Sequence, residues 1–195
     1  DIKGIAVIGR VIETKNIFQD VGAHDPVLLD IAVVALHDSE TDTYSSYIES
    51  EFPKMWPIFE KADLLVGYNS DHFDIPLLNK YYPGDLTQIK SVDIMVAIKN
   101  ALGRRLGLGN VAGATLGLKK SADGMQAYYW WKEGKVQEIR DYCVQDVKVT
   151  KDLYEYILKN KKIMYRDGPN MLPLSLDITD WEKESNHSLT HSFGF

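Results

Sequence analysis

Three acidic residues stand where an unpaired charge would be costly. Glu13 follows an apolar stretch, and Asp74 lies between two apolar residues at the start of a predicted helix. Asp146 follows Tyr142 by four residues, so the two share a helix face that also carries apolar residues. An ionised carboxylate in such surroundings requires a cation or strong hydrogen-bond donors. Each place also has a structural alternative, namely a solvated strand end, a helix cap or a tyrosine–aspartate hydrogen bond.

Taken together, the three carboxylates indicate one kind of chemistry. Side chains from a strand end, a strand-to-helix loop and a packing helix can meet at one point, where like charges stay ionised only if cations lie between them. An all-oxygen donor set suits Mg²⁺ or Mn²⁺. Two such ions roughly 3.5–4 Å apart stabilise the attacking and leaving oxygens of phosphoryl transfer. The pattern therefore favours a phosphodiester as the substrate.

The elements that must position these residues form one mixed α/β domain. Apolar runs predict strands at 5–12, 31–36, 43–48 and 64–68. Apolar residues at helical spacing predict helices at 53–62, 75–82, 93–101, 108–116, 125–131 and 136–159. Beyond these helices the periodicity fades. We expect one domain over residues 1–162 and an irregular tail over residues 163–195.

The composition is that of a single globular domain. The 195 residues suffice for one core, and a hydrophobic content of 45% excludes a disordered chain. The longest apolar runs are far shorter than the roughly 20 residues of a membrane span. The single cysteine, Cys143, forms no internal disulfide, and no basic and then apolar leader opens the sequence, so we expect a cytoplasmic protein. The net charge of −6 argues against bulk coating of nucleic acid, but not against an enzyme of strand ends.

Two further stretches carry weaker signals. No acidic residue occurs from residue 94 to residue 122, a window that contains Arg104, Arg105 and Lys119. This window is either a solvated face or a wall on which Arg104 and Arg105 bind substrate phosphates. The run Tyr-Tyr-Trp-Trp at 128–131 is either part of the core, the commoner use of aromatic residues, or a platform on which bases stack.

These residues resemble a known family, the DEDD 3′–5′ exonucleases in the subset marked by tyrosine, which is related to the proofreading domain of family B DNA polymerases. The family's second motif, Asn followed by Phe-Asp-x-Pro, is matched by Asn69, Phe73, Asp74 and Pro76. Its third motif, Tyr-x-x-x-Asp, is matched by Tyr142 and Asp146. Its first motif, Asp-x-Glu-Thr, is met only in part by Val11-Ile12-Glu13-Thr14. The resemblance implies a ribonuclease H-like mixed β-sheet flanked by α-helices.

The resemblance also implies a role for each matched residue. The residues that would bind two Mg²⁺ or Mn²⁺ ions are Glu13, Asp74 and Asp146. Tyr142 would position the attacking water, while Asn69 and Phe73 would hold the 3′-terminal nucleotide, Phe73 by stacking against a base. The implied reaction removes single nucleotides from a 3′ end, with single strands preferred. The expected partner is therefore nucleic acid and not a membrane.

The first motif departs from the family at its aspartate, which Val11 replaces. In Asp-x-Glu, strand alternation puts both carboxylates on one face, and valine cannot bind a metal. No Asp or Glu lies between Asp1 and Glu13, so no shift of register supplies one. The candidates to replace the missing ligand are Asp71 and Asp141, although Asp141 precedes Tyr142 on the helix and should point elsewhere. Three functions stay open: an exonuclease weakened at one ion, a relative that binds nucleic-acid ends without cleaving them, and a partner-binding domain.

Overall fold

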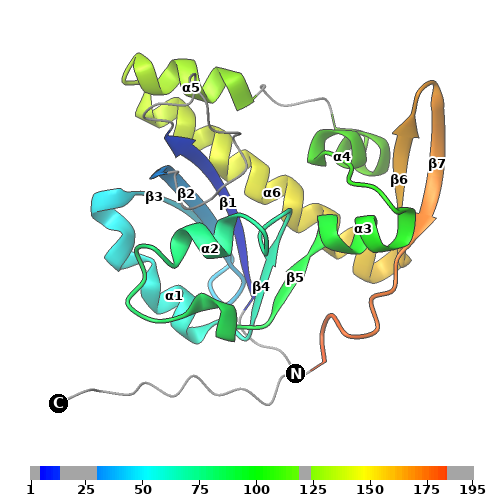
Figure 1. The fold of residues 1–195 in the computed structure, drawn as a ribbon, viewed down its shortest axis with the longest axis horizontal. Helices are drawn as coiled ribbons and strands as arrows, with labels where there is room; N and C mark the ends of the chain where they lie inside the picture. The colour runs from blue at the N-terminus through cyan, green and yellow to red at the C-terminus, as the bar shows by residue number, and fades with distance from the viewer. Residues whose placement is uncertain (1–4, 14–29, 119–123, 184–195) are drawn as a thin grey trace.

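Five strands form the central sheet of the protein. The structure, a computed structural model, describes residues 5–13, 30–118 and 124–183, with side chains for 31–118, 126–127 and 129–183. The strands are β1 (Ile5–Glu13), β2 (Asp30–Asp38), β3 (Thr43–Ile48), β4 (Leu64–Gly67) and β5 (Ser91–Asp93). They lie in the order β3-β2-β1-β4-β5 (Figure 1). The pairs among β1, β2 and β3 are antiparallel, whereas β4 and β5 run parallel to β1. The expected mixed sheet is confirmed.

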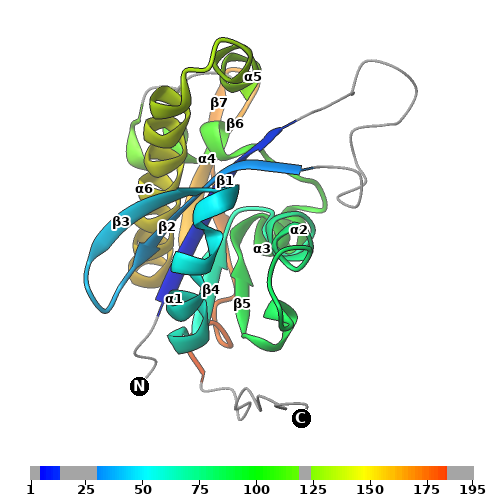
Figure 2. The ribbon, with the colours of Figure 1, turned by 90° about the vertical axis from the view of Figure 1, so that its left-hand side faces the viewer.

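Helices connect the strands and cover both faces of the sheet (Figure 2). They are η2 (Glu49–Lys54), α1 (Trp56–Lys61), α2 (Asp74–Leu78), η3 (Leu86–Gln88), α3 (Ile94–Leu102), α4 (Leu108–Leu116), α5 (Gly124–Lys132) and α6 (Val136–Asn160). Within the described ranges, no helix combines the length and the apolar character that crossing a membrane requires.

Both faces of the sheet are buried. Successive side chains of a strand point to opposite faces, so neighbouring residues pack in different parts of the core. Val33 and Ala35 of β2 pack in the core cluster that α6 covers. Val34 and Leu36, their neighbours in sequence, pack in a second cluster with residues of α1 and α2. Strands buried in this way appear in the sequence as continuous apolar runs, which explains why β2 and β4 were predicted correctly.

A β-bulge interrupts the pairing of β1 with β2 at the level of the first motif. Val11 pairs with Val33 and Ile12 with Ile31, so Ala32 has no partner on β1. The extra residue puts Ala32 and Val33 into the same core cluster although they are neighbours in sequence. Bulges increase the local twist of a strand pair and are frequent beside functional sites. This one lies at the end of β1 that finishes with Glu13.

A β-hairpin replaces part of the irregular tail that the sequence was expected to form beyond residue 162. Strands β6 (Lys162–Asp167) and β7 (Asn170–Ser175) pair antiparallel along their whole length. Gly168 supplies the positive φ of 58° that the turn requires. Pro173 lies on β7, a strand at the edge of this two-stranded sheet, where a residue without an N–H group is tolerated.

Side chains of α4 fasten this hairpin to the domain. Thr115 Oγ1 donates to the carbonyl oxygen of Met164 at 2.9 Å and accepts from the amide of the same residue at 3.0 Å. Asn110 likewise binds both the carbonyl oxygen and the amide of Arg166, each at 2.9 Å. The outer edge of β6 therefore pairs with two helix side chains in place of a third strand, so its backbone groups stay satisfied.

We predict that Thr115→Val lowers the free energy of unfolding by about 1–3 kcal/mol, because it leaves the amide and carbonyl of Met164 without partners while changing the side-chain volume little. Urea denaturation measures the effect. Thr115→Ser is the matched control, since it keeps the hydroxyl, and it should cost clearly less than valine. A cost for Thr115→Ser that equals or exceeds that for Thr115→Val would contradict the prediction, because serine keeps the hydroxyl that makes both hydrogen bonds.

Candidate active site

The loop between β4 and α2 carries the second motif in a constrained backbone. Asn69 has a φ of 66°, in the left-handed region that residues other than glycine rarely adopt. A Cβ atom at position 67 would lie 2.2 Å from Oγ of the buried Ser70, so only Gly67 fits there. The Oδ1 atom of Asn69 is buried and has no hydrogen-bond partner in the part of the chain that the structure describes. The loop thus holds an amide oxygen with unused capacity to accept.

Asp74 opens α2 and is held in the structure, as the sequence predicted. The residue is only 5% exposed. The start of its helix is tied to the preceding loop, because the carbonyl oxygen of Ser70 accepts from the amides of Phe73 at 3.2 Å and Ile75 at 2.9 Å. Phe73 is partly buried against the core cluster on the α1–α2 side. The position of Asp74 is therefore set by the conformation of residues 69–73.

Tyr142 and Asp146 lie together on α6, at the border of its buried face. The core residues of this helix include Ile139 and Cys143, while Tyr142 and Asp146 are each partly exposed. Burial raises the pKa of Asp146 to about 6, and a hydrogen bond from the Tyr142 side chain opposes this shift only in part. The carboxylate is thus desolvated without enough donors to offset its charge, which is a state that a cation would relieve.

An arginine clamp fixes the first half of α6 to the edge of the sheet. Arg140 donates to the carbonyl oxygen of Ser46 and to the carboxylate of Glu51, each at 2.5 Å. Glu51 also accepts from the amide of Ile48 at 3.1 Å. The hydrogen bond from Arg140 is the main reason that the pKa of Glu51 is lowered. Since Asp146 follows Arg140 on the same helix, the clamp restrains its position along the sheet.

The first motif is described in its backbone only. Glu13 is the last residue of β1 and pairs with Asp30 of β2, next to the bulge. Position 11 lies opposite Val33, whose side chain packs in the cluster beneath α6. The side chains of Val11 and Glu13 lie outside the described residues, so the metal-binding role of Glu13 stays a prediction.

The second and third motifs lie at helices that both contact β1. Helix α6 covers one face and α2 the other (Figure 2), and both contact β1. Among the side chains that the structure describes, no group of three His, Cys, Asp or Glu residues is able to hold a metal ion, and that set excludes Glu13. Tyr142 and Asp146 are brought together, whereas the meeting of all three carboxylates stays a prediction.

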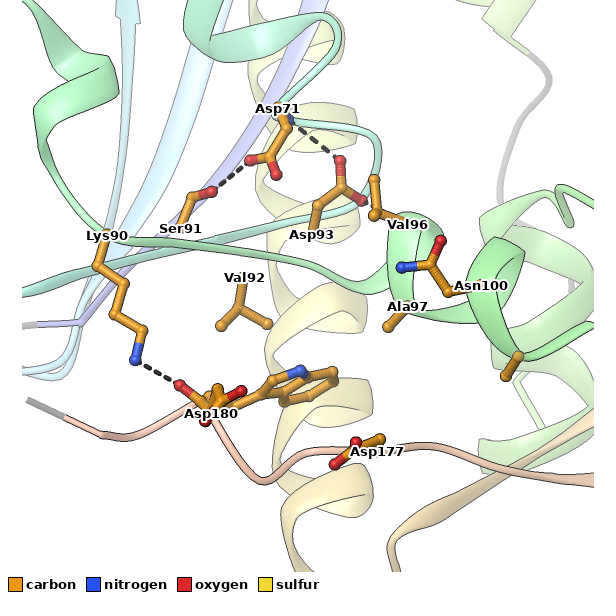
Figure 3. A pocket seen from close by; sticks show the side chains of 12 residues that line it. Asp71, Lys90, Ser91, Val92, Asp93, Val96, Ala97, Asn100, Asp177 and Asp180 are labelled. Carbon is orange, nitrogen blue, oxygen red and sulfur yellow. Dashed lines mark hydrogen bonds between the residues drawn. The ribbon is translucent and has the colours of Figure 1, made fainter. Parts of the chain in front are cut away.

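The two residues considered as replacements for the missing aspartate each accept a hydrogen bond from another side chain of the protein. Asp141 is exposed and accepts from Gln137 at 2.8 Å within α6. Asp71 accepts from the hydroxyl of Ser91 at 2.5 Å and lines a pocket beside β5 (Figure 3). Burial of the Asp71 carboxylate raises its pKa, although the residue as a whole is exposed. Both carboxylates therefore have other hydrogen-bond partners.

The basic window has a structural use at one of its residues. Arg104 forms an ion pair with Asp167 of the hairpin at 3.0 Å, and its guanidinium lies 6.0 Å from the centre of the Tyr165 ring. Arg105 is exposed, and Lys119 lies outside the described residues. The prediction that this window binds phosphates thus stays open for both arginines, and Arg104 also pairs with the hairpin.

The aromatic run on α5 lies beside the third motif. The ring of Trp130 meets that of Tyr142 edge-on, with centroids 6.3 Å apart. Trp130 and Trp131 are partly buried against the core, whereas Tyr129 is 51% exposed. The side chain of Tyr128 is outside the described residues. The two tryptophans therefore serve the core, and Trp130 also packs against the candidate catalytic tyrosine.

Sequence reasoning missed the role of Asp93, which it took only as the start of a helix. Asp93 ends β5 and is 5% exposed. It also lines the pocket of about 520 Å³ that contains Asp71, Lys90 and Trp181 (Figure 3). This pocket includes neither Asp74 nor Asp146, so it is separate from the predicted catalytic residues. The strand that ends in Asp93 is only three residues long, which is too short to show a periodic pattern in the sequence.

Comparison with known proteins agrees with this architecture. The family model of the RNase H superfamily matches residues 12–158, which is more than half of the chain. Among solved structures, the fold is similar to the family B DNA polymerase from the hyperthermophilic archaeon Pyrobaculum calidifontis, with a TM-score of 0.59 and 17% sequence identity over 80% of this chain and 24% of that chain. The protein thus spans about a quarter of the polymerase chain, and the likeness concerns the fold. No curated protein matches the sequence.

We predict that Asp146→Asn stabilises the metal-free protein above pH 6. The pKa of Asp146 is raised from 3.8 to about 6, so the folded wild type loses stability as pH rises through this interval, by at most about 3 kcal/mol. Asparagine does not ionise and escapes this loss. Urea denaturation with a chelator present, from pH 4 to pH 8, measures the difference. Asp141→Asn is the matched control on the exposed face; the idea fails if the two variants show the same pH dependence.

Proposed function

The chain belongs to the RNase H superfamily, and we propose that it is a metal-dependent 3′–5′ exonuclease acting on single-stranded nucleic-acid ends. The observation that carries this proposal is the desolvated carboxylate of Asp146, which is hydrogen-bonded by Tyr142 and has a pKa raised to about 6. Strongly shifted acids of this kind concentrate at functional sites. The Tyr-x-x-x-Asp spacing on a packing helix supports the same assignment.

The donor set fits hard divalent cations, but it is one carboxylate short. Asp74 and Asp146 offer oxygen ligands, and Glu13 lies at the end of a strand that the helices of both contact. Mg²⁺ and Mn²⁺ prefer such ligands. When bound, these ions would stabilise the attacking and leaving oxygens of the phosphodiester. Valine at position 11 removes one expected ligand, so we propose that one of the two ions binds weakly.

The chain's own residues would orient the substrate. Tyr142 would hold the attacking water by its hydroxyl group. Asn69 would help to hold the 3′-terminal nucleotide. Phe73, partly buried next to Asp74, would stack against the terminal base, and Arg105 would meet a phosphate further along the strand. These roles favour an end of a single strand over the middle of a duplex, in which no terminal base is free.

A second candidate function is binding of nucleic-acid ends without cleavage. The observation that favours it is Val11. Loss of a metal ligand impairs cleavage, whereas it leaves the groove that would bind nucleic acid in place. Such a protein would bind single strands with an affinity that falls as salt rises, and it would leave them intact with Mg²⁺ or Mn²⁺ present.

We predict that Val11→Asp increases Mn²⁺-dependent shortening of a single strand by about tenfold or more, because restoring a ligand stabilises transition-state charge by at least about 1.4 kcal/mol. The assay uses DNA and RNA oligonucleotides labelled at the 5′ end, so that stepwise products from the 3′ end are resolved on a gel. Adding Asp146→Asn to this variant should abolish the gain.

Val11→Asn is the size-matched control, since its side chain is a weaker metal ligand and should restore much less. An unchanged rate for Val11→Asp would show that position 11 does not face the metals. Binding of oligonucleotides without cleavage by every variant would favour the second candidate function.

A further inference from the structure

Asp93 is a buried carboxylate that accepts four backbone hydrogen bonds. Its Oδ1 atom accepts from the amide of Asn69 at 2.8 Å, and also from the amides of Met95 at 2.9 Å and Val96 at 3.2 Å. Its Oδ2 atom accepts from the amide of Asp71 at 3.1 Å (Figure 3). Two of these donors belong to the first turn of α3, and the other two belong to the loop that carries the second motif.

Capping of α3 explains only half of this arrangement. An N-cap needs one oxygen atom, and Ser, Thr or Asn serve as well as Asp in that position. The second oxygen of Asp93 bonds to a loop 22 residues away in sequence. The bond to the amide of Asn69 likewise adds nothing to the helix, and it spans 24 residues. A carboxylate with two oxygens at this position is needed only if the loop must be held as well.

The loop held by Asp93 determines where Asp74 lies. Asn69 adopts the left-handed conformation, which costs a residue with a side chain free energy and persists only when its surroundings impose it. The amides on either side of Ser70 bond to Asp93, and the carbonyl oxygen of Ser70 accepts from the amides of Phe73 and Ile75 at the start of α2. An unbroken series of hydrogen bonds therefore connects Asp93 to the backbone on both sides of Asp74.

We propose that Asp93 is a positioning residue of the active site, which holds Asn69 and Asp74 in the geometry that binds substrate and metal. This inference rests on the proposed exonuclease function for its catalytic part. It concerns a residue outside the three carboxylate motifs, at the end of β5, and it assigns the second motif a support on the neighbouring strand. Its structural part is testable in the protein without any substrate.

The test compares Asp93→Asn with Asp177→Asn. Asparagine keeps the Oδ1 atom, and with it the cap of α3, but it turns Oδ2 into an NH₂ group that faces the amide of Asp71. Asp177 is the matched control, because its Oδ1 atom also accepts a backbone amide, that of Thr179 at 3.0 Å, and it lines the same pocket. It forms no hydrogen bond with residues 69–71.

The first measurement is amide hydrogen exchange by nuclear magnetic resonance on the whole chain. In Asp93→Asn, the amide of Asp71, whose acceptor Oδ2 is replaced by an NH₂ group, should exchange about tenfold faster or more, as expected on loss of a charge-assisted bond. The amides of Met95 and Val96 should stay protected. Equal loss of protection in α3 and in the loop, or no loss in the loop, overturns the proposal, since Asp93 would then be a helix cap alone.

The second measurement is the Mn²⁺ concentration that gives half of the maximal cleavage rate, in the wild type or, if more active, in Val11→Asp. Asp93→Asn should raise this concentration about tenfold, because Asp74 is no longer held for the metal, whereas Asp177→Asn should leave it unchanged. A lowered stability alone would not move it. An unchanged Mn²⁺ dependence in an active protein overturns the positioning role and leaves the exonuclease function intact. A wild type that cleaves nothing contradicts the function, and the exchange measurement then decides the role of Asp93.

Discussion

The central sheet is covered on both faces, and this constraint decides where the protein is able to do chemistry. Val33 and Val34, adjacent on β2, point into two different core clusters, so neither face is open to a ligand. In open α/β sheets, ligands bind at the carboxyl ends of the strands. The loop after β4, the last residue of β5 and the end of β1 lie at the carboxyl ends of three parallel strands, and they carry Asn69, Asp93 and the predicted metal ligand Glu13.

Two desolvated aspartates, one buried and one partly exposed, differ in how their charge is balanced. Asp93 receives four backbone amides, and so its charge is offset within the protein itself. Asp146 receives the Tyr142 hydroxyl, which does not prevent its pKa from rising to about 6. The first arrangement is complete without a ligand, whereas the second leaves a cost that a cation would remove. The hydrogen bonds that each carboxylate accepts therefore distinguish a supporting carboxylate from one that is suited to ligand binding.

The sequence predicted the long, strongly patterned elements well, since burial on both faces and helical periodicity leave clear signals in β2, β4 and α6. It identified Asn69, Asp74, Tyr142 and Asp146 through their motifs. It did not predict β5, because three residues contain no period, and so the bonds from Asp93 to the loop were invisible. The hairpin was missed because Pro173 resembles a breaker until the edge position is known. The sequence could not show the pairing of Arg104 with Asp167, and the binding of phosphate by Arg104 stays a prediction.

The attachment of the hairpin to α4 also depends on a match between the spacing of residues along the helix and along the strand. Asn110 and Thr115 are five residues apart, which corresponds to about 7.5 Å along a helix, and the two strand residues they bind are two apart, which corresponds to about 6.7 Å. Because these two distances nearly match, side chains of one helix are able to form hydrogen bonds with every second peptide group of this part of β6. Inserting or deleting one residue between α6 and β6 would present the wrong peptide groups to both side chains and turn Ile163 and Tyr165 outward. The length of the chain between α6 and β6 is therefore fixed by these hydrogen bonds.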